Sequence, residues 1–145
     1  MHNLLRKIMG GKENIVITNN VDELPILAGR IEELAEKWEL SMPLTMNLNL
    51  VLEEAVSNVI FYAFKDKEKH EINISISLEE NNLTIEISDE GIPFDPTLRN
   101  KPDLSLPAEE RPIGGLGIFL ITKIMDSVNY KRLNNKNILT LIKNI

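Results

Sequence analysis

Residues 48–63 limit the fold more than any other stretch, because their apolar side chains recur at helical spacing. Positions three and four residues apart share one face of an α-helix, so the pattern predicts a core helix over about residues 46–64 with one buried face. The side chains on that face are Leu48, Val51, Leu52, Ala55, Val56, Val59 and Ala63.

Two polar residues of this helix, Glu54 and Asn58, lie one turn apart beside Val51, just outside the apolar arc, whereas Glu53 and Ser57 point further toward solvent. They can be ordinary polar residues at the edge of an amphipathic helix. They can also form an oxygen-rich site, in which Asn58 offers its carbonyl oxygen to a hard cation such as magnesium and Glu54 accepts a proton or orients a water. The helix alone leaves both interpretations open.

The whole chain of 145 residues fits a single domain, residues 1–145, with a core at about 14–143. The absence of cysteine excludes disulfides and thiolate metal sites. A net charge of −6, without a long basic run, disfavours binding to nucleic acid. Residues 1–9 contain Arg6 and Lys7 and do not resemble a signal peptide, and no apolar run is long enough to span a membrane. We therefore expect a soluble, cytoplasmic protein with no membrane association.

The remaining pattern predicts strands before and after the core helix in the sequence. A β-branched run at 14–19 predicts a strand, and an amphipathic helix follows at 23–39, with Asp22 as its expected cap and Pro25 in its first turn. Residues 41–45 read as a connection, with Thr45 as the cap of the core helix. Alternating residues predict one hairpin from strands at 72–78 and 83–88 and another from strands at 128–133 and 138–142.

The second strand of the first hairpin ends in Asp89-Glu90-Gly91. Such a triplet often marks only a turn. In a binding site, Asp89 could accept a hydrogen bond from an exocyclic amine, and Gly91 has no Cβ to keep a flat ring away from the backbone. Residues 92–113 then contain five prolines and no apolar periodicity, which is compatible with disorder and equally with a lid that orders over a ligand.

The next motif, Gly114-Gly115-Leu116-Gly117, precedes a helical pattern at 115–127. Free amides and aligned peptide dipoles at the start of a helix favour a phosphate group. The glycine spacing is not that of a dinucleotide-binding fingerprint, and no Gly-Lys-Ser/Thr of a P-loop follows.

Taken together, these motifs resemble the ATP-binding domain of the GHKL superfamily. Glu54-x-x-x-Asn58 is similar to the N box of that superfamily, Asp89-x-Gly91 to its first glycine box, and Gly115-x-Gly117 to its second. Within the superfamily, the phrases around these residues look most like the stand-alone anti-sigma-factor serine kinases of the RsbW and SpoIIAB type. The resemblance covers nearly the whole chain from 14 to 142.

The resemblance implies a role for each matching residue. Asn58 would be a magnesium ligand and Glu54 the general base; Asp89, Gly91 and Phe94 would contact the nucleotide. The amides of Gly114, Gly115, Leu116 and Gly117 would bind the phosphates of ATP, and Arg111 would reach a terminal phosphate. One departure is Pro93, which stands where many members have a second glycine. A sensor histidine kinase also needs a phosphoacceptor histidine, and neither His2 nor His70 suits that role.

The resemblance also implies an α+β fold of the GHKL type, a two-layer α/β sandwich with a mixed, largely antiparallel sheet and the helices at 23–39, 46–64 and 115–127 on one face. It implies a serine/threonine protein kinase that phosphorylates an anti-sigma antagonist, a STAS-like protein, and in its ATP- or ADP-bound form also holds a sigma factor or another regulator. The alternative is a nucleotide-gated protein-binding module with weak or absent catalysis. The open face of the sheet could support a homodimer.

Overall fold

The computed structural model describes residues 10–98 and 115–145, and of residues 115–117 it describes the backbone alone. The strands form one sheet in the order β1-β2-β3-β5-β4. Their bounds are β1 Lys12–Thr18, β2 Glu71–Glu79, β3 Asn82–Asp89, β4 Ser127–Leu133 and β5 Lys136–Asn144. The two predicted hairpins are confirmed as β2–β3 and β4–β5.

All four strand pairings of this sheet are antiparallel, so the expected mixed character is wrong for the described strands. The physical reason lies in the order of the last two strands. β4 is antiparallel to β5, and β5 is antiparallel to β3, so β4 beside β3 would have been parallel. Because β5 lies between them, every neighbour pair keeps the antiparallel hydrogen-bond pattern.

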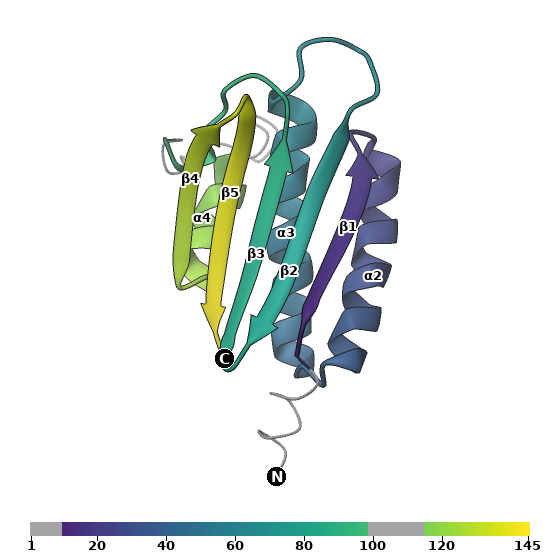
Figure 1. The fold of residues 1–145 in the computed structure, drawn as a ribbon, viewed down its shortest axis with the longest axis vertical. Coiled ribbons are helices and arrows are strands. Elements are labelled where there is room, and N and C mark those ends of the chain that lie inside the picture. Colours follow the sequence, from purple (N-terminus) through teal and green to yellow (C-terminus); the bar gives the residue numbers. More distant parts are fainter. Residues whose placement is uncertain (1–9, 99–114) are drawn as a thin grey trace.

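In the described part of the chain, three α-helices cover one face of the sheet (Figure 1). They are α2 (Leu24–Lys37), α3 (Met42–Tyr62) and α4 (Gly115–Ile124), and a short 3-10 turn, η1 (Val21–Glu23), precedes α2. The core helix α3 is the middle one, and it packs against α2 on one side and α4 on the other. The predicted two-layer architecture is confirmed.

Both predicted helix caps are wrong. α3 begins four residues earlier than expected, because Ser41 accepts the amide hydrogen of Leu44 (3.3 Å) and Pro43 fits the first turn. Thr45 lies inside the helix, and its hydroxyl donates to the carbonyl of Ser41 (2.8 Å). At α2, the side chain of Asn20 accepts the amide hydrogen of Asp22 (2.9 Å), so Asn20 caps the preceding 3-10 turn and Asp22 caps nothing.

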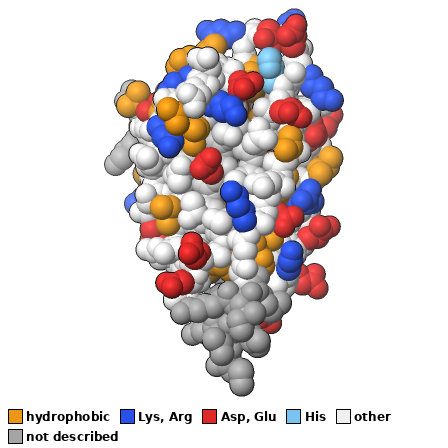
Figure 2. Space-filling view, in the orientation of Figure 1, with side chains coloured by type: hydrophobic (Ala, Val, Ile, Leu, Met, Phe, Trp, Pro, Cys, Tyr) orange, Lys and Arg blue, Asp and Glu red, His pale blue; other side chains and the backbone are white. Residues whose placement is uncertain are grey.

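The core lies between the sheet and the helices. Alternate strand residues point into it, as the period-two pattern predicts, and they meet the buried faces of α2 and α3. The opposite face of the sheet is open; in Figure 2 uncharged polar atoms and backbone (white) cover most of its centre, with charges of both signs scattered around it. Within the described ranges, no helix has the length and hydropathy needed to cross a membrane.

Candidate functional site

The strand register brings two polar residues together inside the core. Asp89 is the last residue of β3, Asn137 is the second residue of β5, and the two are direct cross-strand partners. Both occupy inward-facing positions, and their side chains are only 3% and 4% exposed. Oδ1 of Asp89 accepts hydrogen bonds from the Gly91 amide (2.8 Å) and from Nδ2 of Asn137 (3.0 Å).

Burial raises the pKa of Asp89 above its ordinary value, because a carboxylate loses hydration in this apolar environment. The hydrogen bonds from Asn137 and Gly91, and the nearby charge of Arg132, act in the opposite direction but do not cancel the effect of burial. The site therefore holds a partly desolvated acceptor at the end of β3.

Asn137 makes four hydrogen bonds that join three segments of the chain. Its Nδ2 also donates to the carbonyl of Ile92 (2.8 Å), and its Oδ1 accepts from the amide of Phe94 (3.1 Å) and the hydroxyl of Tyr130 (2.6 Å). Asn137 is not among the site residues predicted from the sequence. The sequence does contain a sign of its role. Asn137 alternates in step with Leu139 and Leu141, so it points into the core, where a polar side chain needs hydrogen-bond partners.

Gly91 lies against the end of α3, and this contact leaves no room for a side chain. A Cβ at Gly91 would lie 2.3 Å from the carbonyl oxygen and 2.8 Å from the Cβ of Ala63, the residue that follows α3. The amide of Ile92 donates to the same carbonyl (2.8 Å), and Arg132 donates to the carbonyl of Gly91 (2.7 Å). Ala63 therefore excludes a side chain at Gly91, and the approach of a flat ring to this glycine stays a prediction.

A small cavity of about 20 Å³ lies beside Asp89 and Asn137. The cavity has room for about one water molecule, and its volume is far below the several hundred Å³ of ordinary ligand pockets. Phe94 and Pro96 from the loop form part of its wall, and Phe94 stacks on Tyr62 at the end of α3 with 5.6 Å between ring centroids. The other lining residues are Ala55, Val59, Ile87, Tyr130 and Leu139.

Asn58 is more deeply buried than the helical pattern predicts, with 1% of its surface exposed. The pattern considered one helix alone, whereas α3 has a neighbour on either side. Neither Oδ1 nor Nδ2 of Asn58 has a hydrogen-bond partner among the described residues. An unpartnered buried amide is costly, so this side chain is suited to a ligand or a hard cation that its oxygen could bind.

Glu54 lies one turn before Asn58 on α3 and is half-buried. Partial burial, followed by the negative charge of Glu53, raises the pKa of its carboxyl group. A raised pKa brings a carboxylate closer to the range in which it accepts a proton efficiently near neutral pH. Glu54 and Asn58 do not line the small cavity themselves, but their neighbours Ala55 and Val59 do.

The other predicted residues divide into two groups. Gly115, Leu116 and Gly117 form the first turn of α4, so the expectation that the glycine cluster starts a helix is confirmed for the backbone. Arg111 and Gly114 lie outside the described residues, as does most of the expected lid at 92–113. Its described part, residues 92–98, contains the short 3-10 turn η2 (Pro96–Leu98).

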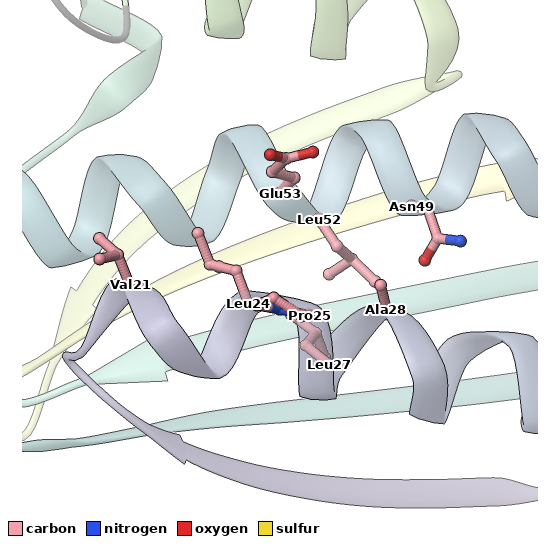
Figure 3. Close-up of a pocket in the computed structure, with 8 residues that line it drawn as sticks. All are labelled: Val21, Leu24, Pro25, Leu27, Ala28, Asn49, Leu52 and Glu53. Atoms are coloured by element: carbon pink, nitrogen blue, oxygen red, sulfur yellow. The ribbon is translucent and has the colours of Figure 1, made fainter.

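A separate hollow of about 320 Å³ lies between α2 and α3 (Figure 3). None of the predicted site residues lines it. In the close-up, Leu52 points toward α2 and Glu53 points away from it. The lining residues are Val21, Leu24, Pro25, Leu27, Ala28, Asn49, Leu52 and Glu53.

Comparison with known families gives a match to the histidine kinase-like ATPase domain over residues 17–143, which includes nearly all of the sheet, the three helices and every residue of the site. The chain belongs to this family. The match confirms the resemblance that Glu54, Asn58, Asp89 and Gly91 suggested, and it agrees with the two-layer fold.

One relative of this histidine kinase-like ATPase domain is the serine-protein kinase RsbW of Listeria monocytogenes (serovar 1/2a, strain EGD-e). The two sequences are 34% identical over 99 residues, which cover 66% of this chain and 63% of the relative. RsbW of Bacillus cereus (strain AH820) is 37% identical over 86 residues, 57% of this chain and 53% of the relative. The matched part of the chain thus spans less than two thirds of these relatives. The histidine kinase domain of the Erythrobacter litoralis EL346 blue-light activated histidine kinase shares the fold, with a TM-score of 0.50, 14% identity, and coverage of 86% of this chain and 60% of that one.

Proposed function

We propose that this domain is an ATP-dependent serine/threonine protein kinase that acts as an anti-sigma-factor-type regulator. Its substrate would be a seryl or threonyl hydroxyl of an anti-sigma antagonist, a STAS-like protein, and it would also hold a sigma factor. Membership of the histidine kinase-like ATPase family and the similarity to serine-protein kinases named RsbW support this proposal.

The observation that carries the proposal is the buried carboxylate of Asp89 at the wall of an apolar cavity. Its Oδ1 is occupied by two donors, and no described residue donates to its Oδ2. An unpaired carboxylate oxygen in such a place can accept a hydrogen bond from an exocyclic amine, and the adenine base carries one at C6. The apolar walls from Val59, Ile87 and Leu139 suit the faces of a flat ring.

The cavity must enlarge before a purine can enter, because its present volume of about 20 Å³ is far too small. Phe94 and Pro96 come from a loop, whereas most of the other walls belong to α3 and to the sheet. The loop is therefore the wall that would move, and the stacking of Phe94 on Tyr62 would change when nucleotide binds. The loop would thus act as a lid, which opens to admit the nucleotide and then closes over it.

Asn58 fits a magnesium ion, because its buried Oδ1 is a hard oxygen with no partner among the described residues. When bound, the ion would offset the negative charge of the phosphates. Magnesium usually takes its other ligands from phosphates and water, so one protein ligand is compatible with such a site. We assign the amides of Gly114, Gly115, Leu116 and Gly117 to the phosphates and Arg111 to the terminal phosphate.

Glu54 is the proposed general base. The hydroxyl oxygen of the partner attacks the γ-phosphorus of ATP in line, the bond from that phosphorus to the β–γ bridging oxygen breaks, and ADP leaves. The hydroxyl proton passes to the carboxylate of Glu54, whose raised pKa favours proton acceptance. Phosphoryl transfer depends mostly on charge stabilisation and positioning, so the base contributes the smaller part of the rate.

The test has two steps, binding and transfer. Isothermal titration calorimetry should show Mg-dependent ATP binding by the wild-type domain and greatly weakened binding by Asp89→Asn; equal affinities would remove Asp89 from the site. Labelled ATP should then transfer its γ-phosphoryl group to a STAS-like candidate protein encoded beside this gene. ATP binding without transfer to any such candidate would instead support a nucleotide-gated binding module. Sedimentation equilibrium would show whether the domain forms a homodimer.

A further inference from the structure

We infer that Asn137 is a positioning residue that fixes the plane of the Asp89 carboxylate, so that one of its two equivalent oxygens faces the ligand, and thereby strengthens the preference of the site for a base with an exocyclic amine. The inference rests on the proposed function, because it concerns the nucleotide site. It gives a role in recognition to a residue that the motifs described above do not contain. Asn137 acts through Asp89, and we assign it no contact with the reacting groups.

The hydrogen bonds of Asn137 admit only one orientation of its amide group. Nδ2 lies between two acceptors, Oδ1 of Asp89 (3.0 Å) and the carbonyl of Ile92 (2.8 Å). Oδ1 lies between two donors, the hydroxyl of Tyr130 (2.6 Å) and the amide of Phe94 (3.1 Å). A flipped amide would place oxygen against both acceptors and nitrogen against the amide hydrogen, so the four contacts fix the orientation.

The fixed amide in turn orients the carboxylate of Asp89. Oδ1 receives one hydrogen bond from Asn137 and another from the Gly91 amide, so both donors hold the same oxygen. Rotation of the carboxylate out of this plane would break both bonds inside a buried site, where unmade hydrogen bonds are costly, whereas a half-turn only exchanges two equivalent oxygens. Oδ2 is therefore the oxygen that a ligand meets, and as a carboxylate oxygen it presents only an acceptor.

The same side chain connects this orientation to the loop. Through Ile92 and Phe94, Asn137 holds the segment that carries part of the cavity wall. Tyr130, on the neighbouring strand β4 of the same hairpin, donates a hydrogen bond to Asn137. Tyr130 bonds only to the Oδ1 side of Asn137, away from Asp89. Tyr130→Phe therefore removes one contact of the network and leaves the bond to Asp89 in place, which makes it a matched structural control.

The inference makes a directional prediction for Asp89→Asn. The new side chain has one oxygen and one nitrogen, and Gly91 and Asn137 both require the oxygen. Its Nδ2 would then occupy the position of Oδ2 and would present a donor where the wild-type domain presents an acceptor. A base with a carbonyl oxygen at C6, as in inosine triphosphate, should now bind better than adenine.

The experiment measures the dissociation constants of ATP and inosine triphosphate, with magnesium, by calorimetry for each variant. We expect the wild-type domain to prefer ATP by about 10- to 150-fold, the range for one hydrogen bond to a charged group. Asn137→Ala should reduce this ratio to less than about threefold, whereas Tyr130→Phe should keep it even if both affinities fall. Asp89→Asn should reverse the ratio, and Asp89→Asn with Asn137→Ala should reverse it less.

The outcomes separate the inference from the proposed function. A wild-type domain that binds neither nucleotide would refute the nucleotide site itself. A wild-type domain that prefers ATP, together with a folded Asn137→Ala variant that keeps the full ratio, would overturn the role of Asn137 alone. If Asn137→Ala does not fold, as circular dichroism would reveal, Asp89→Asn decides, because equal binding of both nucleotides by that variant also contradicts a fixed orientation.

Discussion

Gly91→Ala is the sharpest test of how the site is held together. The added Cβ would lie 2.3 Å from the carbonyl oxygen, 2.9 Å from the carbonyl carbon and 2.8 Å from the Cβ of Ala63. No rotamer can relieve these contacts, because the first two atoms are backbone and the third is a Cβ. An ordinary contact of 3.4 Å would require a displacement of about 1.1 Å (3.4 − 2.3) between the loop and the end of α3.

The cost can be estimated from two effects. Overpacking of this kind typically costs about 1–3 kcal/mol. The displacement would also break the hydrogen bond from Ile92 to Ala63, now 2.8 Å long, at a further cost of about 1 kcal/mol. We expect a total loss of about 2–4 kcal/mol, which for a domain of this size lowers the melting temperature by about 6–14 °C.

Thermal and urea denaturation followed by circular dichroism would measure this loss. Gly29→Ala is the matched control, since a Cβ at Gly29 would meet no atom within 4 Å and Gly29 lies inside α2. Alanine at a helix interior should stabilise the domain by about 0.5–1 kcal/mol, so the same substitution has opposite signs at the two sites. A Gly91→Ala variant as stable as the wild-type domain would show that Ala63 does not restrict this position.

Three further outcomes are expected. Glu54→Gln should keep ATP affinity and lose phosphoryl transfer to the partner; equal transfer by the variant would place the base elsewhere. Asn58→Leu should raise the free energy of unfolding by about 1–3 kcal/mol, because it removes an unpartnered buried amide, and should abolish magnesium-dependent ATP binding; lower stability in urea would contradict the first part. Burial raises the pKa of Asp89 above its unfolded value of about 4, so the contribution of Asp89 to stability should fall as the pH rises from below that value through the raised pKa. The stability of Asp89→Asn relative to the wild-type domain should therefore increase over that range, and a difference independent of pH would contradict the shift.

The sequence was sufficient to predict the elements and the pairing of strands within each hairpin. Helical spacing placed α2, α3 and α4, and period-two alternation placed the two hairpins, because each pattern reflects one buried face of a regular element. The helix ends were less predictable. Ser41 and Thr45 are both capable caps, and the structure shows that Ser41 is the one that accepts an amide hydrogen, from Leu44, with Pro43 in the first turn.

The site was predicted in part. Asp89 and Gly91 were identified because an acid and a glycine mark the end of an alternating strand. Nothing in the sequence shows that Ala63 lies against Gly91 and by itself excludes a side chain there. Asn58 was placed on an exposed edge, because a single helix has no neighbours. Its burial follows from the position of α3 between α2 and α4.

The sequence therefore determined by itself which apolar residues turn inward, because that depends on local periodicity. Only the tertiary structure decided which inward residues meet. Asp89 and Asn137 are 48 positions apart, and they face each other because β5, rather than β4, pairs with β3. That choice depends on how the helices and strands pack together as a whole, and short-range patterns carry no information about it.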